Sequence, residues 1–155
     1  MGAAPLSPLV VMLKVKEMSR PEIVALLLRG KTGHLGCSRD DHPYVVPMNY
    51  AYDGECLFFF TTEGTKTEFI SANSEVCFQV EEVTNESRWL SVMLFGRAER
   101  VTRPEETERA MQLVTGRNPT LTPALNETKI GAWKRFNNVA VYRVRPHSIH
   151  GRKTV

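Results

Sequence analysis

The chain has 155 residues, of which 42% are hydrophobic and 24% charged, and 20 Lys and Arg against 17 Asp and Glu leave a net charge of +3. This length favours one domain, and the composition excludes a disordered tail, a collagen-like fibre and a low-complexity chain. The charge is too small to indicate nucleic acid, and no apolar run approaches the ~18 residues of a membrane span, so we expect neither nucleic acid nor membrane as a partner.

Residues 1–17 show no hydrophobic period, so we expect a loose N-terminal segment there. Ser19 and Glu22 have the spacing of a capping box, and Pro21 is tolerated in the first turn of a helix. Gly30 suits the end of that helix. The pattern predicts a short amphipathic helix whose apolar face carries Ile23, Leu26 and Leu27.

From Gly33 the pattern becomes typical of strands. A short strand is predicted over residues 34–38, and the polar run 40–43 turns the chain. The following run, 44–52, is predicted to be extended. Pro47 lies within it, and because proline has no N–H to donate, this strand needs a sheet edge or a bulge.

The dipeptide Asp53-Gly54 lies between two apolar runs and is a strong β-hairpin signal. It predicts a return strand over residues 55–62 that pairs with residues 43–50. We interpret the three phenylalanines Phe58 to Phe60 as packing residues, since alternate residues of a strand enter the core. The backbone of residues 43–50 would then be available to a flat aromatic ligand beside it.

A second helix is predicted over residues 64–72, with Asn73 suited to end it. Apolar residues alternate with other types over residues 76–81 and again from Leu90 to Val101, which predicts two further strands.

Pro104 opens a predicted third helix, for which Thr102 is the expected cap and Glu105 its partner. Residues 115–132 are rich in Thr, Pro and Asn and are predicted to be irregular or to hold one short helix, and a closing strand is predicted over 139–144. Strands separated by hairpins, with helices inserted between them, predict a mainly β fold, an antiparallel barrel decorated by helices. No repeat or linker divides the chain, so residues 1–155 are expected to form a single domain.

Three cysteines, an odd number in a chain with no secretory signature, indicate a reducing compartment. We predict a cytoplasmic protein in which Cys37, Cys56 and Cys77 are small core residues. His147 and His150 are three residues apart, but no Cys or carboxylate pair accompanies them at ligand spacing, so no metal site is predicted.

The segment from Thr61 to Lys66 lies where a predicted strand ends and a predicted helix begins. A helix N-terminus presents free N–H groups and partial positive charge, which suits a phosphate. Thr61 and Thr65 add hydroxyl donors, Gly64 allows close approach and Lys66 adds a full charge, whereas Glu63 works against an anion unless it points to solvent. An ordinary capped turn explains the threonines equally well.

Several short motifs occur in a characteristic order: His34-Leu35-Gly36, Pro43 to Tyr50, Asp53-Gly54, Gly64-Thr65-Lys66, Asn73 to Phe78, and Phe95-Gly96-Arg97-Ala98-Glu99. Together they resemble the pyridoxamine 5′-phosphate oxidase-like FMN-binding proteins, nearest the nitroimidazole-resistance type. The resemblance covers about residues 19–115 and, more weakly, the final strand near 139–151.

The resemblance implies an antiparallel split β-barrel of the FMN-binding type, and a homodimer with FMN at the subunit interface. Five consecutive residues would line the isoalloxazine and ribityl chain, four would meet the ribityl-phosphate end, and a serine would reach the cofactor from the next long strand. Carried over by position in that order, these residues are Val45, Val46, Pro47, Met48 and Asn49, then Phe60, Thr61, Thr65 and Lys66, and finally Ser91.

The chain also departs from its relatives. The oxidase has basic residues at the positions of Val45 and Tyr50 and an Arg-Lys pair at Thr65-Lys66, and its C-terminal Trp and Arg signature is not evident around residues 133–145. The nitroimidazole branch commonly has a histidine near Phe59 or Phe60. We therefore predict an FMN-dependent oxidoreductase acting on a small aromatic or nitro-type substrate. A non-catalytic protein that holds flavin, haem or a deazaflavin, and a true pyridoxamine 5′-phosphate oxidase, stay open as alternatives.

Overall fold

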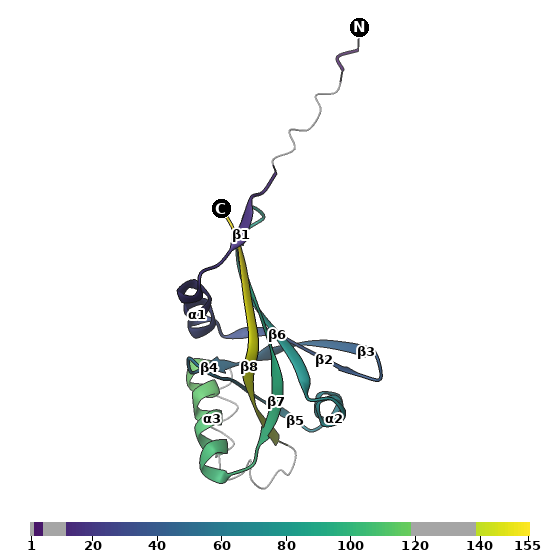
Figure 1. Cartoon of the computed structure of the whole chain (residues 1–155), viewed down its shortest axis with the longest axis vertical. Helices are drawn as coiled ribbons and strands as arrows, with labels where there is room; N and C mark the ends of the chain where they lie inside the picture. Colours follow the sequence, from purple (N-terminus) through teal and green to yellow (C-terminus); the bar gives the residue numbers. More distant parts are fainter. Residues whose placement is uncertain (1, 5–11, 119–138) are drawn as a thin grey trace.

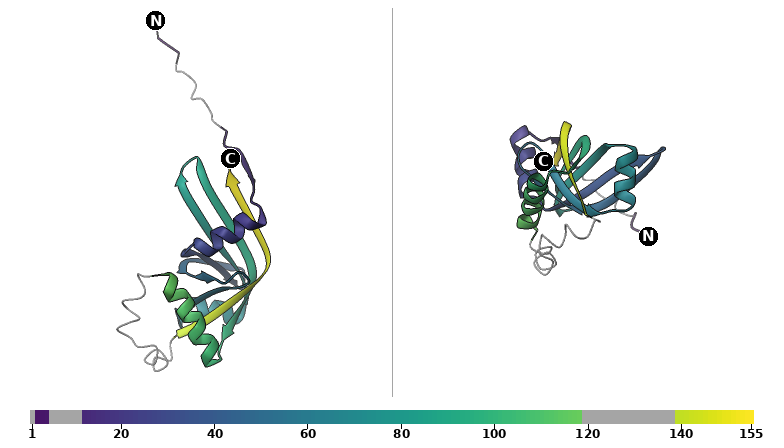
Figure 2. Two further views of the ribbon diagram at one scale, coloured as in Figure 1. Left: turned by 90° about the vertical axis from the view of Figure 1, so that its left-hand side faces the viewer. Right: turned by 90° about the horizontal axis from the view of Figure 1, so that it is seen from below.

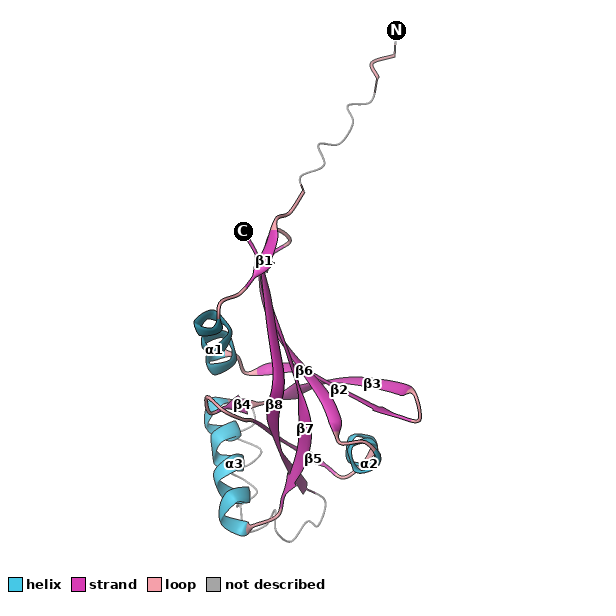
Figure 3. Ribbon diagram, in the orientation of Figure 1, coloured by secondary structure: helices cyan, strands magenta, loops and turns pink. Residues whose placement is uncertain are grey.

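The fold is described by a computed structural model for residues 2–4, 12–118 and 139–155 (Figure 1). In this part of the chain one eight-stranded antiparallel sheet is accompanied by three helices, which lie at its periphery (Figure 3). The helices are α1 (Arg20–Arg29), α2 (Thr65–Ala72) and α3 (Pro104–Arg117). The strands are β1 (Val15–Glu17), β2 (Thr32–Arg39), β3 (His42–Asn49), β4 (Ala51–Tyr52), β5 (Leu57–Thr62), β6 (Glu75–Asn85), β7 (Arg88–Val101) and β8 (Val139–Thr154).

The strands follow the order β3-β2-β6-β7-β8-β5-β4, and β1 pairs with β8 outside this path. The inner face of the sheet is apolar, because alternate residues of β6 and β7 point inward as the sequence predicts. Phe78, Val80, Val92 and Leu94 are at most 1% exposed. The predicted mainly β, antiparallel barrel with inserted helices is therefore confirmed.

The predicted first helix and its capping box are confirmed. The Glu22 amide donates to Ser19 Oγ at 3.4 Å, and the Ser19 amide donates to Glu22 Oε1 at 3.1 Å. The predicted loose segment 1–17 is wrong at its end, because Val15–Glu17 form β1 against residues 152–154 of β8. Strand pairing needs only backbone groups, so this short exposed strand carries no hydrophobic signal.

The predicted hairpin at Asp53-Gly54 forms a tight turn, in which Asp53 Oδ1 accepts from the amides of Glu55 and Cys56 at 2.8 and 2.7 Å. Its predicted partner strand is wrong. The turn joins β5 to the two-residue β4, whereas β3 pairs along its full length with β2 and β5 pairs with β8. The strand is interrupted at Tyr50, so the predicted strand over residues 44–52 forms two strands, β3 and β4.

The closing strand is longer than the predicted 139–144, since β8 continues to Thr154. The second half of β8 joins β6 and β7 in an arm that projects from the barrel (Figure 2). The last five residues of β6 in this arm are exposed, so polar residues suit these strand segments. Pro146 lies at a bulge where the pairing of β7 with β8 shifts register. Proline has no N–H to donate to the neighbouring strand, and a bulge tolerates this loss.

The third helix begins as predicted at Pro104, but its N-cap residue is Arg103 rather than Thr102, and no side chain caps it. The predicted irregular stretch 115–132 lies outside the described residues except for the last turn of α3 and Asn118. No described helix is long and apolar enough to cross a membrane.

Candidate functional site

The end of β3, the second half of β5 and α3 meet around a pocket of about 190 Å³. β3 is the last strand on its side of the sheet and, among the described residues, pairs only with β2. One edge of β3 therefore keeps backbone groups that a flat polar ring can contact. The pocket is lined by Pro47, Met48, Asn49, Phe60, Thr61 and Val114.

Tyr50 fixes the end of β3 beside this pocket. Its side chain is fully buried, and its hydroxyl donates to the Leu27 carbonyl at 2.9 Å. The Tyr50 amide donates to the Lys31 carbonyl at 3.0 Å, and the buried Asn118 side chain donates to the Tyr50 carbonyl at 3.4 Å. These bonds tie α1, the β3–β4 junction and the end of α3 together, so the pocket has a rigid frame.

The first turn of α2 follows β5 directly. Gly64 is its N-cap residue, and Thr67 Oγ1 accepts from the Gly64 amide and donates to the Gly64 carbonyl, both at 2.9 Å. No described residue accepts from the amides of Thr65 and Lys66, so the predicted free N–H groups are present at this helix start.

Lys66 is half-buried, and its helix, α2, packs against β2. Burial raises the pKa of the Cys37 thiol, an effect strengthened by Cys77 and opposed by the positive charge of Lys66.

Glu63, the residue that counted against an anion site, is engaged elsewhere. Its carboxylate is hydrogen-bonded and ion-paired with the Arg100 guanidinium near the end of β7. Arg100 lies opposite Tyr142 in the sheet. Burial raises the pKa of the Tyr142 hydroxyl, Arg100 lowers it and Glu63 raises it, which places both charges of the pair at this end of the barrel.

The structure separates the ten predicted flavin residues into groups. Five of them line the pocket, and Thr65 and Lys66 lie on α2. Val45 is 66% exposed and faces a different hollow, while Val46 is half-buried against the core. Val114 also lines the pocket, although the sequence did not indicate it as a ligand contact. Its helical spacing from Met111 predicts burial but does not predict which strands it packs against.

Ser91 lies apart from the pocket, on the outer face of the sheet. This outer face is defined here by Cys77, Gln79, Ser91, Met93 and Phe95, which alternate with the inward residues of β6 and β7. Gln79 Nε2 donates to Ser91 Oγ at 3.2 Å, and Gln79 Oε1 lies 3.1 Å from His34 Nδ1. Within one chain, Ser91 therefore faces away from the core.

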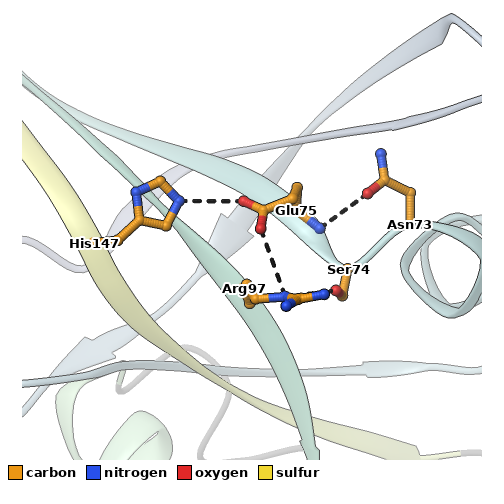
Figure 4. Close-up of polar contacts among 5 residues, drawn as sticks. All are labelled: Asn73, Ser74, Glu75, Arg97 and His147. Carbon is orange, nitrogen blue, oxygen red and sulfur yellow. Dashed lines mark hydrogen bonds and ion pairs between the residues drawn. The ribbon is translucent and has the colours of Figure 1, made fainter.

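The outer face contains a second hollow of about 310 Å³, lined mainly by apolar atoms of Val45, Cys77 and Phe95 and bordered by His147. At this border the Glu75 carboxylate contacts two side chains, with its oxygens 3.2 Å from His147 Nε2 and 3.5 Å from Arg97 Nε (Figure 4). Cys77 is half-buried here, so the prediction that every cysteine is a core residue holds only for Cys37 and Cys56.

A third hollow, of about 350 Å³, lies elsewhere, between α3 and strands β5 and β8. It is lined by Arg109, Arg143 and Arg145 together with Asp53, Glu55 and Glu106, and by none of the ten predicted residues. Its opposite charges balance, so size alone does not make it the functional site.

Comparison with known proteins decides the family. The sequence profile described as pyridoxamine 5′-phosphate oxidase matches residues 19–153, most of the chain. The chain belongs to this family. A curated relative from Rhizobium meliloti, an uncharacterized protein, is 37% identical over 83 residues, which are 54% of this chain and 55% of the relative. The match thus spans about half of that family relative's length.

Solved structures agree with the family's fold. A FAD-binding protein from Mesorhizobium loti is 26% identical with a TM-score of 0.76, over 93% of this chain and 99% of that one. A protein from Bacteroides thetaiotaomicron, provisionally assigned to 5-nitroimidazole antibiotic resistance, is 23% identical with a TM-score of 0.75, over 93% and 90% of the two chains. A FAD-binding protein from Mycobacterium smegmatis is 22% identical with a TM-score of 0.63, over 89% and 98%. The split-barrel fold is shared by all three.

Proposed function

We propose that this protein is a flavoprotein that binds FMN between the free edge of β3 and the first turn of α2. The observation that carries this proposal is the meeting of β3 and β5 around one pocket, directly before a helix start with free amides. The flat ring would contact the backbone of residues 47–49, and the phosphate would meet the amides of Thr65 and Lys66 and the Lys66 ammonium. Family membership and the FAD-binding neighbours support a flavin as the ligand.

A second copy of the chain would complete the site. The pocket of about 190 Å³ is smaller than the roughly 300–1,000 Å³ of sites that enclose a ligand of this size. The outer face is half-buried among the described residues, and Phe95 at one end of it is 38% exposed. We propose a homodimer in which this face meets its copy and FMN lies at the interface, with Ser91 reaching the cofactor there.

The phosphate site distinguishes FMN from FAD. A helix start with Lys66 beside it suits a terminal phosphate, which carries more negative charge than the internal phosphates of a dinucleotide. Two structural neighbours are FAD-binding proteins, so the flavin released by denaturing the purified protein identifies the cofactor. FMN is the expected product, and FAD would contradict this part of the proposal.

As the reaction, we propose reduction of a small neutral aromatic or nitro-type substrate. Bound flavin supplies the redox chemistry, and the chain supplies position and electrostatics. Where the oxidase has basic residues, this chain has the apolar Val45 and the buried Tyr50, whose hydroxyl is already bonded to Leu27. Neither can anchor a substrate phosphate, and burying such a dianion unpaired is prohibitive.

The reaction is tested on the FMN-loaded protein after anaerobic reduction with a nicotinamide or chemical reductant. Reoxidation by a nitroaromatic compound should be faster than reoxidation by oxygen alone. If the two rates are equal, the protein is a flavin-binding module without this activity. Formation of pyridoxal 5′-phosphate from pyridoxamine 5′-phosphate at more than ~1 per second would instead establish the oxidase activity.

A further inference from the structure

The ion pair between Glu63 and Arg100 lies next to the proposed phosphate site. Glu63 directly precedes Gly64, the N-cap residue of α2, and is therefore within three residues of both Thr65 and Lys66. Carboxylates are attracted to a helix N-terminus by its partial positive charge, as phosphates are. An unpaired Glu63 would therefore compete with a bound phosphate for the same amides and repel it.

Arg100 removes this competitor. It lies in β7, 37 residues away in sequence, and binds the Glu63 carboxylate across the end of the barrel. Of the other charged groups at this helix start, Lys66 attracts a phosphate, and Glu68 lies in the first turn exposed to solvent. Glu63 is thus a carboxylate beside the site whose position depends on a distant partner.

We propose that Arg100 is a positioning residue for flavin phosphate binding, which acts by holding Glu63 away from the first turn of α2. This inference rests on the proposed function, because it requires the flavin phosphate to bind there. Arg100 thereby increases the preference of the protein for FMN over riboflavin, which has the same ring and ribityl chain but no phosphate.

The test measures the dissociation constants of FMN and riboflavin for the full-length protein and for Arg100→Gln, Glu63→Gln and the double variant. Arg100→Gln should weaken FMN by roughly threefold to tenfold, the effect of one partly solvated charge near a dianion, and leave riboflavin unchanged. The loss should shrink at high salt. Adding Glu63→Gln should abolish it, so that the double variant matches Glu63→Gln within about twofold.

Arg29→Gln is the matched control. Arg29 pairs with Glu82 at 2.9 Å between α1 and β6 and is as exposed as Arg100, each side chain at 47%. This control should leave the FMN-to-riboflavin ratio of affinities unchanged. Because both pairs are at the surface, the variants should fold, and Arg100→Lys, which keeps the charge, should retain most of the wild-type ratio.

Three outcomes would overturn the inference while wild-type FMN binding stands. Equal losses for FMN and riboflavin would make Arg100 merely structural. A loss that persists in the double variant would mean that Arg100 contacts the phosphate itself, and an unchanged ratio in Arg100→Gln would mean that Glu63 does not compete. If wild-type protein binds no FMN, the proposed function fails first and the inference falls with it.

Discussion

Tyr50 donates its hydroxyl hydrogen to the carbonyl of Leu27 at 2.9 Å, inside the core and between the end of β3 and the last turn of α1. Gly30 lies against the same hydroxyl, which a Cβ at that position would meet at 2.2 Å. The aromatic ring packs edge-on against Phe78, with 5.3 Å between ring centroids. The hydrogen bond between Tyr50 and Leu27 thus holds α1 against the end of β3, the strand that carries the proposed flavin site.

Tyr50→Phe should lower the free energy of unfolding by about 1–3 kcal/mol, because it leaves the Leu27 carbonyl buried without a partner. Chemical denaturation at neutral pH measures this difference. Tyr52→Phe is the matched control, since its hydroxyl bonds to the Gly54 carbonyl at 3.0 Å in a less enclosed position and should cost less. A Tyr50→Phe variant as stable as wild type would show that water satisfies this carbonyl.

Lys66→Ala should weaken FMN by roughly tenfold to a hundredfold, as expected for a lost charge-assisted hydrogen bond of about 1.5–3 kcal/mol. Riboflavin should lose much less, because it has no phosphate for Lys66 to contact. Lys16→Ala, in the exposed β1, removes the same charge far from α2 in the chain and should affect neither ligand. Equal losses for both flavins in Lys66→Ala would assign Lys66 a structural role.

The start of α1 is tied to the end of β8 by an ion pair between Glu22 and Lys153. Hydrogen bonding to Lys153, and then to Ser19, lowers the pKa of Glu22 from 4.5 to about 2. A lowered folded-state pKa stabilises the fold above pH 4.5, and that contribution is lost as pH falls from 4.5 through 2.

Thermal melts of wild type and Glu22→Gln across this pH range test the linkage. The wild type should be more stable at pH 7, and the difference should close as pH falls, while glutamine keeps the capping bond to Ser19. The control Glu86→Gln, in the β6–β7 turn, should show no such closing difference. A gap between wild type and Glu22→Gln that does not change with pH would contradict the ion-pair origin.

A homodimer built through the outer face should return twice the mass of the 17.5 kDa chain in light scattering at micromolar concentration. Phe95→Glu should yield monomers, because the proposed interface would then bury an unpaired charge. Arg88→Glu, at the exposed start of β7, should leave the dimer intact. If light scattering returns the mass of a single chain for the wild type, the proposed dimer interface is wrong.

Local signals in the sequence predict what is local in the structure. The capping box of Ser19 and Glu22, the alternation in β6 and β7, and the end of α2 at Asn73 are all confirmed. The hairpin signal at Asp53-Gly54 predicts the turn but not the partner strand, because pairing of β3 with β2 depends on how the whole sheet closes.

Contacts between residues far apart in the chain cannot be predicted from the sequence for the same reason. Nothing near Glu63 indicates that Arg100, on another strand, neutralises it, and the spacing of Val114 in α3 does not indicate which pocket it lines. The alternation of apolar residues predicts only the first part of β8, because an exposed arm needs backbone pairing but no apolar face.

Flavin binding is tested by titrating the cofactor-free protein with FMN and recording the absorbance of the flavin bands. We expect a saturable change in these bands with one FMN bound per chain, and a weaker change with riboflavin, which lacks the phosphate. Flavin bands that stay those of free FMN up to high-micromolar concentration would contradict this expectation.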